Sequence, residues 1–395
     1  TSTRGRGMAR IHMGICGIGL GHASRSLVIA KKLLSMGHEL SISTYGDAVE
    51  FFNKYGLPIN KSLSIGYGLG PDGAFSFRGT ILRNIFLPIT VAAQVSIEYR
   101  IMSDVGPAAV FSDTRATTIL AAKLMGIPTA LLLNQFYLLV RSERWHRLAE
   151  ITEAASSIVA HVWSLSDILL ISDYQPPLTV SEDNLRLPSS IEGRTVYVGP
   201  IMSRTPRDYP PRNELKRKLG FRQDEPLILI QATGPRQERE RFTEKIINAL
   251  PGLRDMQIIF TRGRPSSGYS FRSDRLWVVD WVVDEYELLA ASDVVVSRAG
   301  QSLLTKALAY GCRLVTVPIP RHSEQESNAR SLMNKGAAVV LNEEMLNSET
   351  LRTAITQAYD TISDEVVSRY VEQAGRLGGA AEVVRQVLQL YKNFS

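Results

Sequence analysis

The segment Asp293–Ala329 constrains the fold of this 395-residue chain more than any other. Val294–Val296 is a short β-branched run, which is typical of a strand buried on both faces of a parallel sheet. A glycine-containing turn over residues 297–301 and a predicted helix over Ser302–Tyr310 follow. Leu314–Val317 is a second buried strand. The spacing therefore predicts a strand–turn–helix–strand unit of an α/β sheet.

The turn between this first strand and its helix is a candidate anion-binding site. Free backbone N–H groups at the start of a helix point toward such a turn, and the helix dipole favours negative charge there. Arg298 adds a positive charge in the same turn. A phosphate or diphosphate is the expected ligand, although an ordinary α/β unit that binds nothing has the same pattern.

Polar residues follow other predicted strands of this half of the chain. Thr233 and Gly234 come after the strand Leu227–Ile230, and the polar run Glu324–Ala329 follows the strand Leu314–Val317. Open α/β sheets bind ligands at the carboxyl ends of their strands. Thr233 and Gly234 are therefore candidates for hydrogen bonds to a diphosphate.

A similar pattern begins the chain. Arg10–Cys16 is predicted to be a strand, and the glycine-rich turn Gly17–His22 leads into a helix. Gly19 and Gly21 in this turn allow a ligand to approach the backbone closely. The turn lacks the dinucleotide fingerprint, because His22 stands where the final glycine would be, so NAD binding is only weakly indicated.

His22 is a candidate general base. A histidine at a helix start, beside a glycine loop, can accept a proton from a substrate hydroxyl near neutral pH. The helix dipole at this end also disfavours the imidazolium and so favours the free base. A plain turn residue remains an alternative interpretation of His22.

The C-terminal half resembles the nucleotide-sugar-binding end of GT-B glycosyltransferases, both the UDP-glycosyltransferase (UDP-glucuronosyltransferase-like) type and the peptidoglycan GlcNAc transferase type. The positions that carry the resemblance are Gly300, Ser302, Pro318, Glu324, Gln325, Asn328 and Ala329. The resemblance to this superfamily extends beyond that half, from about Met8 to the end of the chain, and is strongest at Gly17–His22 and Asp293–Ala329. It implies an α/β fold of GT-B type, with two Rossmann-like domains whose parallel sheets face each other across a cleft.

The resemblance also implies domain boundaries. Residues 8–200 would form an N-terminal Rossmann-like domain that binds the acceptor, and residues 207–377 a C-terminal Rossmann-like domain that binds the nucleotide-sugar. Residues 378–395 would form a C-terminal helix that crosses back to the N-terminal domain. The proline-rich stretch between residues 202 and 212 has the composition of a stiff linker.

The activity implied by the resemblance is inverting glycosyl transfer from a nucleotide-diphosphate sugar, with a UDP-sugar favoured, to an acceptor hydroxyl. His22 would be the catalytic base, and Asp113, which ends a buried strand, would orient it. A helix N-cap is an equally compatible role for Asp113. The implied donor-binding residues are Thr233, Gly234, Trp281, Val282, Arg298, Gly300, Gln301, Ser302, Lys306, Glu324 and Gln325.

The resemblance assigns several of these residues to particular parts of the donor. Trp281 and Val282 would hold the base, while Glu324 and Gln325 would contact the sugar. A stacking role for Trp281 competes with an ordinary place in the core. Lys306 departs from the family pattern, which has a glutamate here that holds the ribose hydroxyls. An ammonium can only donate hydrogen bonds, so Lys306 leaves the identity of the donor open.

The composition bears on partners and location. The net charge of +6 and pI near 9.2 favour anionic partners, whether nucleotides, an acidic membrane surface or nucleic acid, and do not choose among them. With the resemblance, a nucleotide-sugar is the expected partner and no nucleic acid is expected. Cys16 and Cys312 are too few and too far apart for a disulfide framework, which predicts a cytoplasmic protein. The interrupted apolar segment Ile81–Ile97 is first interpreted as a core helix, and the alternative, which the basic pI supports, is a lipid acceptor and peripheral contact with the inner face of a membrane. The oligomeric state is not predicted.

The sequence has no Asp-x-Asp pair and only scattered histidines, so no cofactor and no metal ion are expected. Helix dipoles and Arg298 would then neutralise the leaving diphosphate. Two alternative functions share the architecture. One is a non-hydrolysing nucleotide-sugar 2-epimerase, which needs more carboxylates than the sequence offers near the sugar. The other is a non-catalytic nucleotide-sugar-binding protein.

Overall fold

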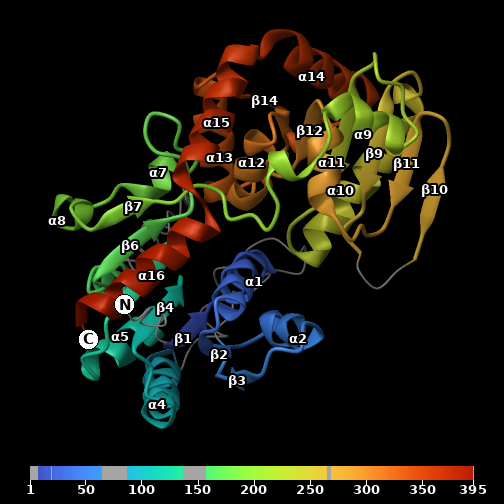
Figure 1. The fold of residues 1–395 in the computed structure, drawn as a ribbon. Helices are drawn as coiled ribbons and strands as arrows, with labels where there is room; N and C mark the ends of the chain where they lie inside the picture. The colour runs from blue at the N-terminus through green and yellow to red at the C-terminus, as the bar shows by residue number, and fades with distance from the viewer. Residues whose placement is uncertain (1–7, 19, 65–86, 137–156, 265–267, 395) are drawn as a thin grey trace, which may run out of the picture. The chain divides into compact units, whose positions relative to one another are not determined.

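The computed structural model describes residues 8–18, 20–64, 87–136, 157–264 and 268–394, in two compact units (Figure 1). Unit 1 comprises the chain through Ser172 together with Leu185–Ile201 and Gly378–Ser395. Unit 2 comprises Asp173–Asn184 and Met202–Leu377. Each unit is built on its own seven-stranded sheet.

Unit 1 has a parallel sheet with the strand order β3-β2-β1-β4-β5-β6-β7. Its strands are β1 (Arg10–Ile15), β2 (Glu39–Thr44), β3 (Ile59–Lys61), β4 (Ala109–Asp113), β5 (Thr129–Leu133), β6 (Ile168–Ile171) and β7 (Thr195–Tyr197). Its main helices are α1 (Leu20–Ser35), α2 (Asp47–Lys54), α4 (Leu87–Val105), α5 (Ala116–Leu124), α8 (Ser189–Glu192) and α16 (Ala380–Phe394), and α7 (Glu182–Leu185) bridges the two units in sequence. The strand order reverses between β1 and β4, so the carboxyl ends of these two strands flank the switch point where such sheets bind ligands.

Unit 2 has the strand order β10-β11-β9-β8-β12-β13-β14, in which only the β10–β11 pair is antiparallel. Its strands are β8 (Leu227–Gln231), β9 (Gln257–Thr261), β10 (Ser270–Arg272), β11 (Leu276–Val279), β12 (Val294–Ser297), β13 (Arg313–Thr316) and β14 (Ala338–Val340). Its helices are η1 (Pro206–Asp208), α9 (Arg212–Lys218), α10 (Arg236–Ala249), η2 (Leu250–Leu253), α11 (Glu285–Ala291), α12 (Gln301–Ala309), α13 (Ser323–Asn334), η3 (Glu343–Met345), α14 (Ser348–Thr361) and α15 (Asp364–Leu377). Here the order reverses between β8 and β12, which places a second switch point at the ends of those strands.

The C-terminal helix α16 belongs to the core of unit 1. Val383, Val384 and Val387 are buried in the same cluster as residues of α1 and β1. Each such side chain contributes about 1.5–3 kcal/mol by leaving water. Gly379, whose φ is +52°, allows the chain to enter this helix, because a Cβ there would lie 2.6 Å from the carbonyl oxygen of Pro200.

The segment Asp173–Asn184 packs with unit 2, although the sequence prediction placed it in the first domain. The Asp173 carboxylate accepts hydrogen bonds from the backbone N–H groups of Tyr174, Val180 and Ser181. The Tyr174 hydroxyl donates to the carbonyl of Thr305, and its ring packs edge-on against Tyr370. These buried contacts attach the segment to the helices of unit 2.

Helix α4 buries a polar stripe instead of an apolar one. Its inward residues are Gln94, Glu98 and Met102. The Glu98 carboxylate lies 2.8 Å from both His12 Nε2 and Arg115 Nη2. Burial alone would raise the pKa of Glu98, but Arg115 and His12 lower it to about 2. The helix is therefore held to the sheet by buried charges as well as by Met102, while Ile89 and Tyr99 are exposed among polar residues of its outer face.

Among the described residues, no helix combines the length and the apolar character that crossing a bilayer requires.

Candidate active site

His22 and Asp113 meet at the switch point of unit 1. His22 lies in the first turn of α1, directly after β1, and Asp113 is the last residue of β4. His22 Nδ1 is 2.9 Å from Asp113 Oδ1. Asp113 is fully buried, whereas the side chain of His22 remains 22% exposed. The buried carboxylate therefore holds the His22 ring, which remains accessible to a ligand.

The Asp113 carboxylate is held on both oxygens. Arg25 Nε and Ser26 Oγ each donate to Oδ2 over 2.8 Å, and Arg25 Nη2 donates to Oδ1. Burial alone would raise the pKa of Asp113, but Arg25 and His22 lower it well below its usual range. The N-cap interpretation is wrong, since Ser112 Oγ accepts the hydrogen bond from the Arg115 backbone N–H at the start of α5.

Two groups compete for Nδ1 of His22, the ionised Asp113 carboxylate, which can only accept, and Arg25 Nη2 at 3.0 Å, which can only donate. The His22–Asp113 pair therefore forms when Nδ1 of His22 carries the proton. Nε2 then has a free lone pair, which is the arrangement required of a general base. The sequence interpretation missed Arg25. Its spacing of three residues from His22 on one helix face was the available signal.

The glycines of the turn Gly17–His22 have different surroundings. A Cβ at Gly17 would lie 1.8 Å from the carbonyl oxygen of Tyr45, so only glycine fits there. Gly21 lies exposed in the first turn of α1. Gly19 is outside the described residues.

The switch point of unit 2 carries an open glycine turn. Gly300 directly precedes α12, and no heavy atom of the described residues lies within 4 Å of a Cβ built on it. Ser302 in the first turn of α12 and Thr233 after β8 are partly exposed, and Gly234 has φ +103°. Thr233, Gly234 and Ser302 are therefore at least partly accessible, and the space beside Gly300 is open.

Two predicted donor ligands are instead structural. Arg298 is fully buried, with Nη1 2.8 Å from Glu343 Oε2 and 3.2 Å from the carbonyl oxygen of Val317. Gln301 is 2% exposed, and its side chain hydrogen-bonds to Asp173. Both side chains are engaged away from solvent, so in this structure neither is placed to contact the donor, and the predicted roles of Arg298 at the diphosphate and of Gln301 in donor binding stay predictions.

Arg239 of α10 provides positive charge near the turn after β8. Its Nη1 lies 3.5 Å from the carbonyl oxygen of Gly234, and its Nε has no hydrogen-bond partner among the described residues. Burial and the nearby Arg264 and Arg236 lower the pKa of Arg239, although Glu240 opposes this. Such a site gains from a bound anion. The sequence signal was the run of arginines in the first turns of this helix.

The base-binding candidates lie between β11 and α11. Trp281 is 52% exposed, so the alternative of a core aromatic is wrong. Val282 is partly buried against the main core of unit 2. Lys306 of α12 lies 2.5 Å from Glu285, the first residue of α11. The exposed indole of Trp281 therefore lies four residues before Glu285, whose carboxylate pairs with Lys306 of α12.

Glu324 and Gln325 begin α13, after β13. Gln325 is buried, and its Oε1 accepts a hydrogen bond of 3.0 Å from the backbone N–H of Ile319. Asn328 Nδ2 donates to the carbonyl of Ala299, which joins α13 to the turn before α12. Glu324 is partly exposed. Of the two predicted sugar ligands, Glu324 has the more accessible side chain.

No group of three histidine, cysteine, aspartate or glutamate side chains that could hold a metal ion occurs in the part of the chain that the structure describes. Metal independence stays a prediction.

Comparison with known proteins agrees with this architecture in both units. A model of the glycosyltransferase family 28 C-terminal domain matches residues 265–370, and a model of glycosyl transferase family 1 matches residues 9–189. An uncharacterised glycosyltransferase of Methanopyrus kandleri is 26% identical over 84% of this chain and 92% of its own length.

Two further proteins are similar over part or all of the chain. A UDP-N-acetylglucosamine--N-acetylmuramyl-(pentapeptide) pyrophosphoryl-undecaprenol N-acetylglucosamine transferase of Exiguobacterium sibiricum is 28% identical over 50% of this chain and 56% of its own. The crystal structure of CalG4, the calicheamicin glycosyltransferase, covers 98% of this chain and 100% of its own with a TM-score of 0.69 at 16% identity. The sequence matches in both halves are to glycosyltransferases and the two-unit fold is of GT-B type, and together they support a GT-B glycosyltransferase.

Proposed function

We propose that this glycosyltransferase is inverting and metal-independent and uses a nucleotide-diphosphate sugar, with a UDP-sugar favoured. The observation that carries the proposal is the His22–Asp113 pair at the switch point of unit 1. The open turn at Gly300 occupies the equivalent point of unit 2. A base and a vacant anion site are the two parts that direct displacement at an anomeric carbon requires.

In the proposed reaction, Nε2 of His22 removes the proton from an acceptor hydroxyl. The acceptor oxygen forms a bond to the anomeric carbon from the face opposite the diphosphate. The bond between that carbon and the diphosphate oxygen breaks, and the diphosphate leaves with the electron pair. Asp113 stabilises the imidazolium that forms on His22.

The donor would lie along unit 2. Trp281 would stack on the base beside Val282, and Glu324 would contact the sugar. The diphosphate would accept hydrogen bonds from Thr233, Gly234, Gly300 and Ser302. The N-termini of α10 and α12, together with Arg239, supply the positive potential that the buried Arg298 does not.

Gly300 gives a test of the donor site that does not disturb the fold. We expect the wild type to be stabilised in a thermal-shift screen by one nucleoside diphosphate, because a ligand of the folded state raises the unfolding midpoint. Gly300→Ala should weaken that binding at least about tenfold, since a methyl group would fill the space beside the backbone N–H groups. Without ligand the variant should unfold within about 1 kcal/mol of the wild type, as its Cβ meets no protein atom.

Gly375→Ala is the matched control, because Gly375 is exposed on α15 and a Cβ there also meets no heavy atom within 4 Å. It should leave nucleotide binding unchanged. A wild type whose midpoint responds to no nucleoside diphosphate or nucleotide-sugar would contradict the proposed donor.

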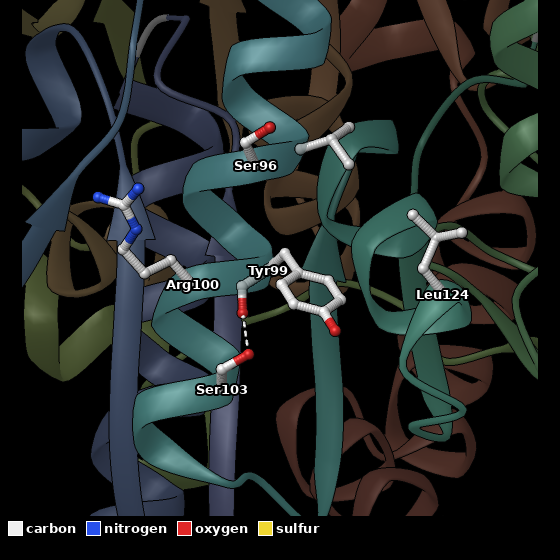
Figure 2. Close-up of a pocket in the computed structure, with 6 residues that line it drawn as sticks. Ser96, Tyr99, Arg100, Ser103 and Leu124 are labelled. Carbon is white, nitrogen blue, oxygen red and sulfur yellow. Dashed lines mark hydrogen bonds between the residues drawn. The ribbon is translucent and has the colours of Figure 1, made fainter.

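We propose in addition that the acceptor is lipid-linked and that α4 contacts the lipid surface. The name of the Exiguobacterium relative includes a pyrophosphoryl-undecaprenol acceptor. Ile89 of α4 is 67% exposed and Leu124 of α5 is 67% exposed. A pocket of about 460 Å³ is lined by Val95, Ser96, Tyr99, Arg100, Ser103 and Leu124, and Figure 2 shows the side chains that line it. Apolar side chains beside an arginine suit an anionic lipid surface.

The wild type is expected to co-sediment with phosphatidylglycerol-containing vesicles at low salt, and Ile89→Glu with Leu124→Glu should reduce the bound fraction several-fold. Met345→Glu in unit 2 changes a residue of similar exposure and should have no effect. Absence of vesicle binding by the wild type at low salt would overturn the lipid contact while leaving the donor proposal intact.

A further inference from the structure

A cluster of acceptor groups lies beside the switch point of unit 2. Glu285 Oε1 is 2.5 Å from Lys306 Nζ, and Glu285 Oε2 receives a 3.4 Å hydrogen bond from Gln231 Nε2. Gln231 ends β8, Glu285 begins α11 and Lys306 lies in α12, so three elements converge here. The Glu285–Lys306 ion pair joins two different helices, and no pattern in the sequence predicts it.

The exposure of the two charged side chains decides which one faces a ligand. The Glu285 side chain is 34% exposed and the Lys306 side chain only 14%. Burial would raise the pKa of Glu285, but Lys306 and the hydrogen bond from Gln231 lower it. Lys306 is therefore the more buried partner, and it holds an ionised carboxylate that remains partly exposed.

Gln231 adds an unsatisfied acceptor to the same place. Its Oε1 is buried and accepts no hydrogen bond from any described residue. A carboxylate and an amide oxygen together lack donors, so they match hydroxyl groups and not a phosphate. A ligand with neighbouring hydroxyls would donate to the partly exposed Glu285 carboxylate, which Gln231 contacts from the buried side.

The start of α11 is fixed independently of this cluster. Asp284 caps the helix by accepting hydrogen bonds from the backbone N–H groups of Tyr286 and Glu287. The Tyr209 hydroxyl donates to Asp284 Oδ2 over 2.7 Å, and Arg204 pairs with the same carboxylate. The backbone of Glu285 is thus held in place before any ligand binds, which limits the entropy cost of binding.

We propose that Glu285 is the residue that recognises the ribose hydroxyls of the nucleotide and that Lys306 is its positioning residue. This inference rests on the proposed function. The order along unit 2 supports it, because Glu285 follows the exposed Trp281 by four residues and is joined through Lys306 to α12, whose N-terminus is the anion site. In a nucleoside diphosphate the ribose lies between the base and the diphosphate in the same order.

The test compares each of UDP, GDP and ADP with its 2′-deoxy counterpart by calorimetry, and the nucleotide that binds the wild type most tightly is carried forward. The wild type should prefer the ribonucleotide by about tenfold to a hundredfold, the usual effect of one hydrogen bond to a charged acceptor. Glu285→Gln should reduce this preference to about threefold or less. Lys306→Met keeps the carboxylate but not its position, and it should give an intermediate preference.

Glu287→Gln is the matched control, because Glu287 lies in the same helix and its 2.5 Å pair is with Lys218. It should keep the full preference for ribose. A purely structural pair would lower the unfolding midpoint in Glu285→Gln and leave the preference unchanged, which would overturn the assignment of Glu285 alone. A wild type that binds the two sugars equally would overturn it as well, whereas a wild type that binds no nucleotide would overturn the proposed function itself.

Discussion

Replacing His22 by alanine is expected to lower the rate constant of sugar transfer by about 10²- to 10⁴-fold, the usual contribution of a positioned general base. The acceptor hydroxyl would then have to lose its proton to water. Binding of the nucleotide should not change, because His22 belongs to unit 1 and the donor residues belong to unit 2. Single-turnover transfer rates and nucleotide affinity, measured on the same preparation, check both parts.

His161→Ala is the matched control, since His161 is an exposed histidine of the same unit. It should retain wild-type rates. His22→Ala is a cleaner variant than Asp113→Asn, because the latter would leave the buried Arg25 guanidinium without its carboxylate and would cost stability as well. A His22→Ala enzyme that transfers sugar at the wild-type rate would remove the general base from the mechanism.

The strands of both sheets are predicted by local sequence patterns. Val294–Val296 and the other β-branched runs form strands of parallel sheets because both faces are covered. His22 and Asp113 meet because residues that follow neighbouring parallel strands emerge at one edge of the sheet. The strand prediction depends only on local pattern, whereas the pairing of His22 with Asp113 is implied by the family resemblance and agrees with the geometry of parallel sheets.

The partners of charged side chains depend on longer-range contacts. Arg298 was assigned to the diphosphate because it lies in the anion-binding turn, yet its guanidinium turns inward to Glu343 and Glu238, which come from η3 and α10. The family pattern has a glutamate at the position of Lys306, and the ion pair of Lys306 with Glu285 is apparent only in the structure. Which carboxylate a cation meets is decided by packing of helices that are distant in sequence.

The exposed apolar residues of α4 also escape prediction from periodicity. Hydrophobic patterning assigns apolar residues to the core. In this helix Gln94 and Glu98 face inward because Arg115, His12 and Thr117 supply partners for them. A buried network of this kind is invisible until the strands and helices that contribute to it are placed together.

Arg298→Met is expected to destabilise unit 2 by about 3–5 kcal/mol, the usual cost of removing one partner from a buried ion pair. Glu343 and Glu238 are 2% and 4% exposed, so each would lose its buried cation, although Arg241 still pairs with both at the edge of the site. The Arg298 guanidinium also lies 4.7 Å from the ring centroid of Phe242, a contact that methionine only partly replaces. The midpoint of urea unfolding is the appropriate measurement.

Two comparisons separate this structural role from a role in binding. Arg254→Met removes an exposed arginine of the same unit and should change stability by no more than about 0.5 kcal/mol. Arg298→Met combined with Glu343→Gln should recover part of the loss, because the neutral amide no longer requires a buried cation. If Arg298→Met instead unfolded like the wild type but failed to bind the nucleotide, the guanidinium would have to leave Glu343 and reach the diphosphate. Without the Arg298 guanidinium, the donor would then not be held by the remaining groups, which are the open turn at Gly300, the α12 N-terminus and the partly exposed Arg239 of α10.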